Sequence, residues 1–122
     1  MNSPVRGMSI KFKLWLEQDG KPVFGIGKLK LLKAIRREGS ISKASKMTHI
    51  SFRRAWSHLD DAEKNFGIPL LEKHRGGKGG GSSSLTGEAC ELVSRFERLT
   101  DEVREFAQQR FEELFVFPVH DD

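Results

Sequence analysis

The residues best suited to recognising a charged partner lie at positions 51–57, which read Ser-Phe-Arg-Arg-Ala-Trp-Ser. Arginine binds guanine through two hydrogen bonds to its major-groove edge, and a serine hydroxyl donates to a phosphate or a base. We therefore expect Ser51, Arg53, Arg54 and Ser57 to contact DNA. Phe52 could touch a thymine methyl, or equally pack beneath the turn before it.

A helix must position these side chains, and the spacing of apolar residues predicts one over residues 52–66. Its inward positions, separated by four, three and four residues, are Ala55, Leu59, Ala62 and Phe66. Arg53 then lies about 200° around the helix from Ala55, away from the core. Trp56 lies beside the inward stripe, and we expect it in the core. The acidic residues that follow would repel phosphates, which limits DNA contact to roughly the first two turns.

A shorter helix is predicted just before this one, over residues 41–48, with Ser40 and Ser51 as the two N-caps. Two helices with this spacing, the first very short, are typical of a helix-turn-helix. The expected inner stripe of the short helix is Ile41, Ala44 and Met47, with Ala44 where the helices cross. On its outer side we expect Ser40, Ser42 and Lys43 to position the DNA backbone.

A glycine-rich hairpin is predicted directly after the helix-turn-helix. Residues 70–75 suit a strand, residues 76–83 suit neither helix nor strand, and residues 84–85 could pair back. A hairpin in this place is called a wing. Its expected contacts with the neighbouring groove or its phosphates come from Arg75, Gly77, Lys78 and Gly79.

The N-terminal part predicts a second hairpin, over residues 10–24. Apolar and charged residues alternate from Ile10 to Leu14, which is typical of a half-buried strand, and Asp19-Gly20 is a strong turn signal. Residues 21–24 could return as a short edge strand, because Pro22 cannot donate a ladder hydrogen bond. A helix over residues 28–38 should follow, ending at Gly39.

The last element is one long helix, predicted over residues 87–115 with Thr86 as its N-cap. A seam with coiled-coil spacing runs along it, formed by Leu92, Phe96, Leu99, Val103 and Phe106. Because so small a domain offers little surface to cover this seam, we expect it to pair two chains in a homodimer. The alternative is that the seam packs back on the first helix and the strands.

These elements give one expected fold class, which is mainly α with a small β content. It is a winged helix-turn-helix (28–86) with an N-terminal β-hairpin (10–24) and a long C-terminal dimerisation helix (87–115), forming a single domain over residues 1–122. The sequence holds no run of 18 apolar residues and no apparent secretory signal. We therefore expect no membrane contact and a cytoplasmic location.

Charge is distributed unevenly along the chain. Residues 28–86 carry 13 basic and 5 acidic side chains, a net of +8, whereas residues 87–122 carry 4 and 10, a net of −6. A basic middle joined to an acidic tail favours a polyanion-binding surface, although two solvated faces of opposite sign would also fit.

Catalysis, metal binding and cofactor binding find no support in the residue pattern. Cys90 is the only cysteine, the histidines have no metal-ligand spacing, and no carboxylate pair converges. The run Gly25-Ile26-Gly27 follows a strand as in a dinucleotide fingerprint, but Lys30 replaces the third glycine. The glycine run near Lys78 is not a P-loop, because Gly79 follows where Ser or Thr is required. We expect a non-enzyme without a cofactor or a metal.

Several motifs together resemble the DNA-binding domain of ModE-type molybdate-responsive transcriptional regulators. They are Gly39-Ser40-Ile41-Ser42, Ile50-Ser51-Phe52-Arg53-Arg54-Ala55-Trp56, Gly67-Ile68-Pro69-Leu70, and Gly76-Gly77-Lys78-Gly79-Gly80-Gly81 with Leu85-Thr86. The helix-turn-helix alone also resembles LysR-type regulators. The resemblance implies a dimer on a palindromic operator, with Ser51, Arg53, Arg54, Ser57 and Lys78 facing DNA.

Two departures from the ModE pattern matter. The C-terminal oxyanion-binding region of that family has no counterpart in these 122 residues, so molybdate or tungstate binding is not expected of this chain. His49 stands where such turns usually have glycine, and histidine tolerates the left-handed conformation better than most residues. The main alternative function is a protein-interaction or non-specific DNA-binding module on a winged-helix scaffold.

Overall fold

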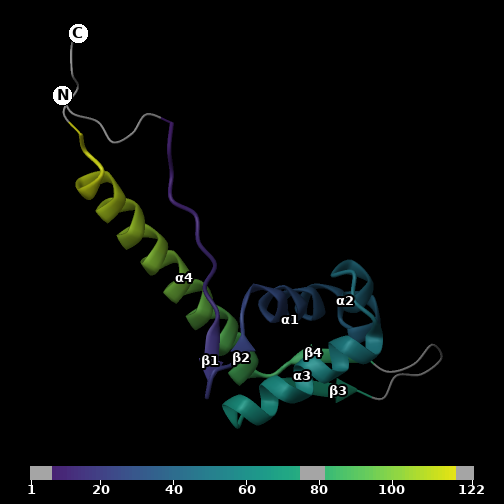
Figure 1. The fold of residues 1–122 in the computed structure, drawn as a ribbon. Coiled ribbons are helices and arrows are strands. Elements are labelled where there is room, and N and C mark those ends of the chain that lie inside the picture. The colour runs from purple at the N-terminus through teal and green to yellow at the C-terminus, as the bar shows by residue number, and fades with distance from the viewer. Residues whose placement is uncertain (1–6, 75–81, 118–122) are drawn as a thin grey trace. The chain divides into compact units, whose positions relative to one another are not determined.

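The computed structural model describes residues 7–74 and 82–117 (Figure 1). By its own contacts the chain falls into two units. The larger is Leu14–Arg95, and the smaller joins the N-terminal residues up to Lys13 to the chain from Phe96 onward. No helix of the described residues is long and apolar enough to cross a membrane.

The larger unit is built on three helices: α1 (Ile26–Glu38), α2 (Ile41–Met47) and α3 (Phe52–Phe66). Glycines end α1 and α3 in the left-handed conformation, Gly39 at φ 76° and Gly67 at φ 66°. This conformation costs glycine little, because it has no Cβ. The predicted helix-turn-helix is confirmed, and α3 has the predicted bounds. The expected start of α1 at residue 28 is wrong: the helix begins at Ile26, because Gly25 serves as its N-cap and Gly27 is accommodated in the first turn.

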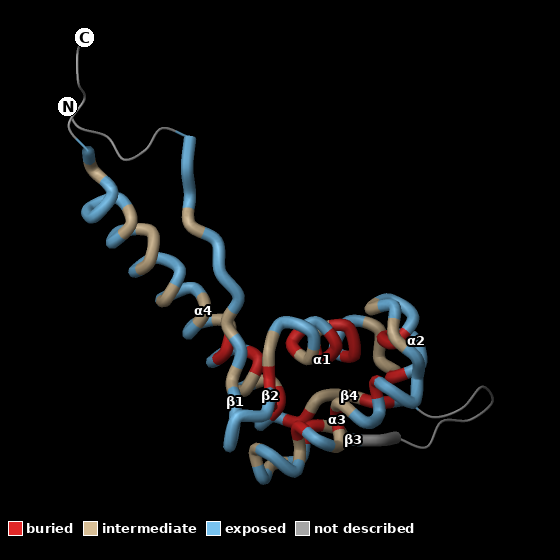
Figure 2. The backbone as a smooth tube through the Cα atoms, viewed as in Figure 1, coloured by how far each residue is buried: buried red, intermediate tan, exposed pale blue. Residues whose placement is uncertain are grey.

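The core of the larger unit lies between these helices (Figure 2). Its largest fully buried side chains are Phe24, Leu31, Leu32, Ile35, Leu70 and Val93. Phe66 closes one end of α3 against Phe24, with ring centroids 5.7 Å apart in an edge-to-face arrangement. Ala44 is completely buried in α2, which packs against both α1 and α3, so the small residue lies where it was predicted.

A two-stranded wing follows α3. Strand β3 (Leu71–His74) pairs antiparallel with β4 (Ser82–Leu85), with Leu71 opposite Leu85. Two backbone hydrogen bonds fix its base, from Ser83 N to Gly39 O (2.9 Å) and from Thr86 N to Leu70 O (3.0 Å). The predicted wing is confirmed, but the expected bounds of its second strand are wrong: Ser82 and Ser83, expected outside it, pair with His74 and Lys73. The glycine run that disfavours a strand ends at Gly81, so it does not extend to these two serines.

The N-terminal hairpin is shorter than predicted. Strand β1 is Leu16–Gln18 and β2 is Lys21–Phe24, joined by Asp19 and Gly20, which both have positive φ. The expectation that a strand begins at Ile10 is wrong, because residues 10–15 form no strand. The partner strand ends at Phe24 and the chain then enters α1, so nothing remains to pair with that segment.

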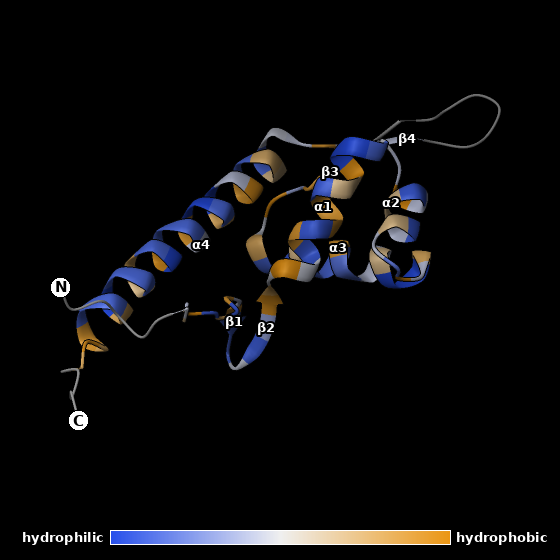
Figure 3. Cartoon of the chain, turned by 90° about the horizontal axis from the view of Figure 1, so that it is seen from above, coloured by the Kyte–Doolittle hydropathy of each residue, from blue (hydrophilic) through white to orange (hydrophobic). Residues whose placement is uncertain are grey.

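The smaller unit contains most of the last helix, α4 (Gly87–Leu114), whose first residues belong to the larger unit. Hydrophobic residues recur along α4 among hydrophilic ones (Figure 3). Beside the helix runs the N-terminal segment, which is tied to it by a hydrogen bond from Ile10 N to Gln108 Oε1 at 3.3 Å. Thr86 caps α4 as predicted, since its hydroxyl accepts a hydrogen bond from Ala89 N at 3.0 Å.

Candidate nucleic-acid interface

Local hydrogen bonds hold the start of each helix of the helix-turn-helix. The Ser40 hydroxyl oxygen accepts from Lys43 N, and the Ser51 hydroxyl oxygen accepts from Arg54 N, both at 3.1 Å. Both serines are therefore N-caps, as predicted. Each hydroxyl keeps its hydrogen, so capping leaves the group able to donate to a phosphate.

The turn between α2 and α3 uses an unusual backbone conformation. His49 has φ 60°, in the left-handed region where non-glycine residues are uncommon. Its N–H donates to Lys46 O at 3.3 Å, and Ile50 N donates to Ser45 O at 3.0 Å. The expected left-handed histidine is confirmed, and these bonds fix the angle at which the chain enters α3.

Helix α3 presents a polar face opposite its buried stripe. Ala55, Leu59 and Ala62 are buried, whereas Arg53, Arg54 and Ser57 are exposed. Phe52 is also exposed rather than packed beneath the turn. The exposed face brings two cations and a hydroxyl to the first two turns of the helix, which is where a recognition helix meets base edges.

The arginines of α3 and α4 differ in their partners. In α4, all four arginines form ion pairs with acidic residues three or four positions away. Within the described residues, Arg53 and Arg54 have no such partner. Further along α3, Lys64 pairs with Asp60 at 2.9 Å. The uncompensated positive charge of α3 therefore lies in its first turn.

A second basic group lies on the flank of α3. Burial lowers the pKa of His58, and the nearby cations Lys28 and Arg54 lower it further, whereas Asp61 acts in the opposite sense. Burial also lowers the pKa of Lys28, against the effect of Asp61. Lys28 belongs to α1, so packing of α1 beside α3 is what brings it to His58. No local sequence pattern indicates that Lys28 and His58 come close, because their proximity depends on this packing.

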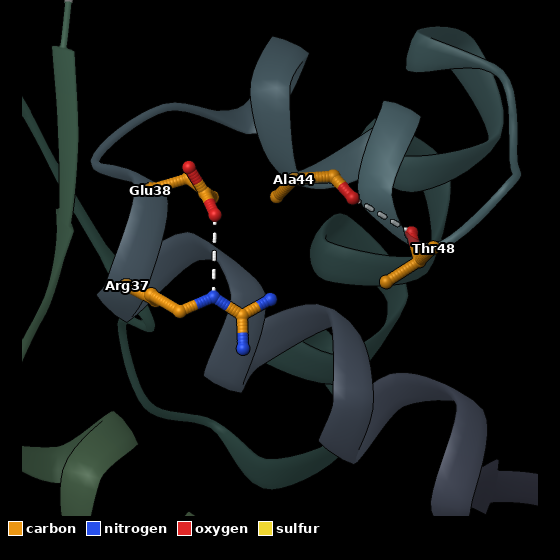
Figure 4. Close-up of polar contacts among 4 residues, drawn as sticks. All are labelled: Arg37, Glu38, Ala44 and Thr48. Carbon is orange, nitrogen blue, oxygen red and sulfur yellow. Dashed lines mark hydrogen bonds and ion pairs between the residues drawn. The ribbon is translucent and has the colours of Figure 1, made fainter.

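The outer side of α2 carries further predicted contacts. Ser42 and Lys43 are exposed, and Ser40 is half-buried at the start of the helix. The end of α2 is closed by Thr48, whose hydroxyl donates to Ala44 O at 2.8 Å (Figure 4). In the same view, Arg37 Nε lies 3.2 Å from Glu38 Oε1, so one cation at the end of α1 is partly compensated.

Two side chains expected in the core lie at the surface. Trp56 is 41% exposed, because it is turned about 100° from Ala55 and reaches the rim of a shallow hollow beside Leu59, Pro69 and Leu71. Met47 is 53% exposed, because the two turns of α2 bury Ile41, Ala44 and Ser45 instead. The Ser45 hydroxyl is satisfied there by donating to Ser42 O at 2.8 Å.

Four predicted DNA contacts remain, all from the glycine-rich segment between β3 and β4. Arg75, Gly77, Lys78 and Gly79 lie outside the described residues. What the structure does place is the base of the wing, where β3 leaves and β4 returns beside Gly39.

The predicted seam of α4 is only partly covered. Phe96 is buried, and Leu92 and Val103 are half-buried. Leu99 remains 40% exposed and Phe106 65% exposed. The described chain thus leaves two seam residues with substantial apolar area in water.

The architecture is a winged helix-turn-helix, the class of fold in which one helix is presented outward beside a β-hairpin. A model of the lysR family of bacterial regulatory helix-turn-helix proteins matches residues 26–89. This stretch is more than half of the chain, and the chain belongs to that family.

Curated relatives match more than half of the chain. It is 40% identical over 72 residues to the transcriptional regulator ModE of Haemophilus influenzae, covering 59% of this chain and 28% of that protein. It is 29% identical over 102 residues to the molybdenum transport protein ModE of Azotobacter vinelandii, covering 84% and 38%. The chain thus spans well under half the length of these relatives.

Solved structures share the fold. A crystal structure of a CbnR_DBD–DNA complex matches with TM-score 0.52 at 22% identity, covering 68% of this chain and 90% of that one. Vibrio fischeri DarR in complex with DNA matches with TM-score 0.51 at 14% identity, covering 68% and 27%. At these identities the likeness establishes the fold alone.

Proposed function

We propose that this chain is the DNA-binding part of a transcriptional regulator that binds double-stranded DNA as a dimer. The observation that carries the proposal is the pair Arg53 and Arg54, exposed at the start of α3 without an acidic partner in the described residues. In a globular domain, arginines without a partner at the start of an outward helix suit bidentate contact with guanine or phosphate.

The relatives support this reading. Those that match in sequence carry the names of transcriptional regulators and molybdenum transport proteins, and two neighbours in fold were crystallised with DNA. Arg53, Arg54, Ser57 and Phe52 are assigned to the major groove, and Ser40, Ser42, Lys43 and Ser51 to the backbone. The wing residues Arg75, Gly77, Lys78 and Gly79 are assigned to the neighbouring groove or its phosphates.

A dimer follows from the seam of α4. Leu99 and Phe106 repeat with the spacing of Leu92, Phe96 and Val103, and a second copy of the helix would cover them. Two copies related by a two-fold axis would present two α3 helices to the two halves of a palindromic operator.

Selection from a random duplex DNA pool at near-physiological salt, followed by sequencing of the bound fraction, tests the proposal. We expect an enriched inverted repeat whose half-site spacing reports the distance between the two recognition helices. Salt-sensitive binding without an enriched sequence would indicate a non-specific DNA-binding protein instead of a sequence-specific regulator. No binding at all would favour a protein-interaction module.

A further inference from the structure

An open groove lies beside the turn of the helix-turn-helix, within the larger unit. Its volume is about 630 Å³, which is in the range of small-molecule sites. The apolar part of its lining comes from β2, α2, the residue before β1 and the turn, and includes Trp15, Val23, Phe24, Met47 and Ile50. Trp15 and Met47 are both more than half exposed, so the groove has a large apolar surface in contact with water.

The start of α1 forms one wall of the groove, where Gly25, Gly27 and Lys28 line it. Gly25 is the N-cap and offers no side-chain hydrogen bond, and no acidic residue occupies the first turn. The first N–H groups of α1 therefore have no capping side chain. No acidic residue of the first turn offsets the partial positive charge at this end of the helix. A Cβ built on Gly27 would meet nothing within 4 Å, which shows open space at this point of the wall.

Side-chain charge in the groove has the same sign as this helix end. The cations Lys28 and Lys30 line it beside the imidazoles of His49 and His58, and Asp61 is the one carboxylate among the described lining residues. The Lys28 ammonium donates to Val23 O at 3.0 Å, which holds this cation at the wall. The burial that lowers the pKa of both Lys28 and His58 means that water alone solvates these groups poorly.

We propose that this groove is a binding site for a small aromatic carboxylate, with the ring against Trp15 and Val23 and the carboxylate at the N-terminus of α1 beside Lys28. An offset-stacked aromatic ring suits the exposed indole, and backbone N–H groups together with an ammonium suit a carboxylate. The run Gly25-Ile26-Gly27 thus has a role other than the dinucleotide fingerprint, because Gly27 leaves the space that the ligand fills.

The groove also bears on the recognition helix. Thr48, His49 and Ile50 of the turn line it, and His58 belongs to α3. A ligand in the groove would contact the turn that sets the entry angle of α3, and so would change the affinity for DNA. This consequence rests on the proposed function, whereas the binding site itself does not.

The test is calorimetric titration of the full chain with naphthalene-2-carboxylate, and with naphthalene-2-methanol as its neutral analogue. We expect the carboxylate to bind with a Kd of about 10–500 μM, the range of a small ligand with few polar contacts, and the alcohol to bind at least about tenfold more weakly. No binding of the carboxylate at millimolar concentration would overturn the proposal. Equal binding of both compounds would also overturn it, since the helix terminus and Lys28 would then contribute nothing.

Substitutions locate the site. Gly27→Leu should abolish binding by filling the groove. Gly87→Leu, at the start of α4, is the matched control: a Cβ there also meets nothing within 4 Å, and this variant should bind like wild type. Lys28→Gln should weaken binding about tenfold, and Asp61→Asn should strengthen it severalfold, because a carboxylate in the groove repels the ligand. Thermal unfolding establishes that each variant folds. Carboxylate binding that is unchanged in Gly27→Leu would place the ligand elsewhere and overturn the assignment.

A separate titration of duplex DNA, with and without saturating naphthalene-2-carboxylate, tests the effect on the recognition helix. We expect the Kd for DNA to change at least severalfold when the carboxylate is bound. By thermodynamic linkage, DNA must then change the Kd for the carboxylate by the same factor. If the wild-type protein binds the carboxylate and DNA independently, the binding site stands but its proposed effect on DNA binding is refuted. Loss of DNA binding under all conditions would instead refute the proposed function and leave the groove standing.

Discussion

Arg53 and Arg54 differ from the arginines of α4 in their surroundings. The arginines of α4 are each matched by a nearby carboxylate, so their fields are largely cancelled. The two arginines of α3 are exposed, and within the described residues no carboxylate offsets them. Their charge is therefore free to act on an approaching polyanion.

Arg53→Ala tests this role directly. We expect it to weaken binding to the selected operator by about 1–3 kcal/mol and to relax the preference at one base pair, because a bidentate contact is removed. Titration of operator duplexes with single base changes measures both effects. Arg98→Ala, which removes an exposed arginine already paired with Glu102, is the matched control and should leave affinity unchanged. A variant Arg53→Ala that binds its operator as tightly as wild type would contradict the assignment.

The lowered pKa of His58 predicts that the stability of the fold depends on pH. Its pKa in the folded chain is lowered below the value of about 6.5 expected in the unfolded chain. Between the two values the unfolded state binds more protons, so the free energy of unfolding falls as pH drops through about 6.5. In His58→Gln we expect a smaller loss of stability between pH 8 and pH 5. Urea unfolding at a series of pH values measures this, and an identical pH profile in both proteins would exclude His58 as the cause.

At the scale of elements, the arrangement depends on how closely α2 approaches α1 and α3. Ala44 is completely buried in α2, and Thr48 closes that helix by donating to Ala44 O. A methyl group is all that the contact accommodates, because protein interiors are close-packed. The position of α3 thus depends on one small side chain in α2.

Ala44→Leu should separate α2 from the helices that it contacts. We expect a loss of about 1–3 kcal/mol in the free energy of unfolding from overpacking, and weaker operator binding because α3 is displaced. Lys46→Leu adds a leucine at an exposed position of the same helix and serves as the control. Urea unfolding gives the stability, and a variant Ala44→Leu that is as stable as the control would show that the crossing is loose.

In a single copy of the whole molecule, several apolar side chains remain exposed to water. Leu99 and Phe106 are exposed on α4, and the exposed residues near its C-terminal end include Leu114, Phe115 and Phe117. Phe111, Phe115 and Phe117 form a chain of ring contacts in the same region. Contiguous apolar surface of this kind is typical of an interface between subunits.

Phe106→Asp tests the proposed dimer. Burying a carboxylate in the seam is unfavourable, so we expect the dimer Kd to rise at least about tenfold and binding to a two-half-site operator to weaken with it. Gln109→Asp places the same charge on an exposed position of the same helix, away from the seam, and should remain dimeric. Sedimentation equilibrium gives the association constants. A wild-type protein that stays monomeric at high concentration would refute the dimer, with the DNA-binding role of Arg53 still to be judged by its own titration.

Elements whose causes are local could be predicted from the sequence. The bounds of α3 were predictable from Ser51, the four apolar residues of its inner stripe and Gly67, all within a few turns of one another. The caps at Ser40 and Thr86 were predictable for the same reason, whereas the left-handed turn at His49 was expected from the resemblance to ModE-type regulators. A cap or a turn depends on residues three or four positions apart, which a sequence pattern contains.

Features that depend on residues distant in the sequence could not be predicted in this way. The strand expected from Ile10 does not form because its partner ends at Phe24, and Trp56 reaches the surface because the core is filled by other side chains. Lys28 and His58 meet because α1 packs beside α3, and the groove between the hairpin, α1 and the turn exists only once all three are assembled. Pairing, burial and desolvation are properties of groups brought together across the chain, so no local pattern reports them.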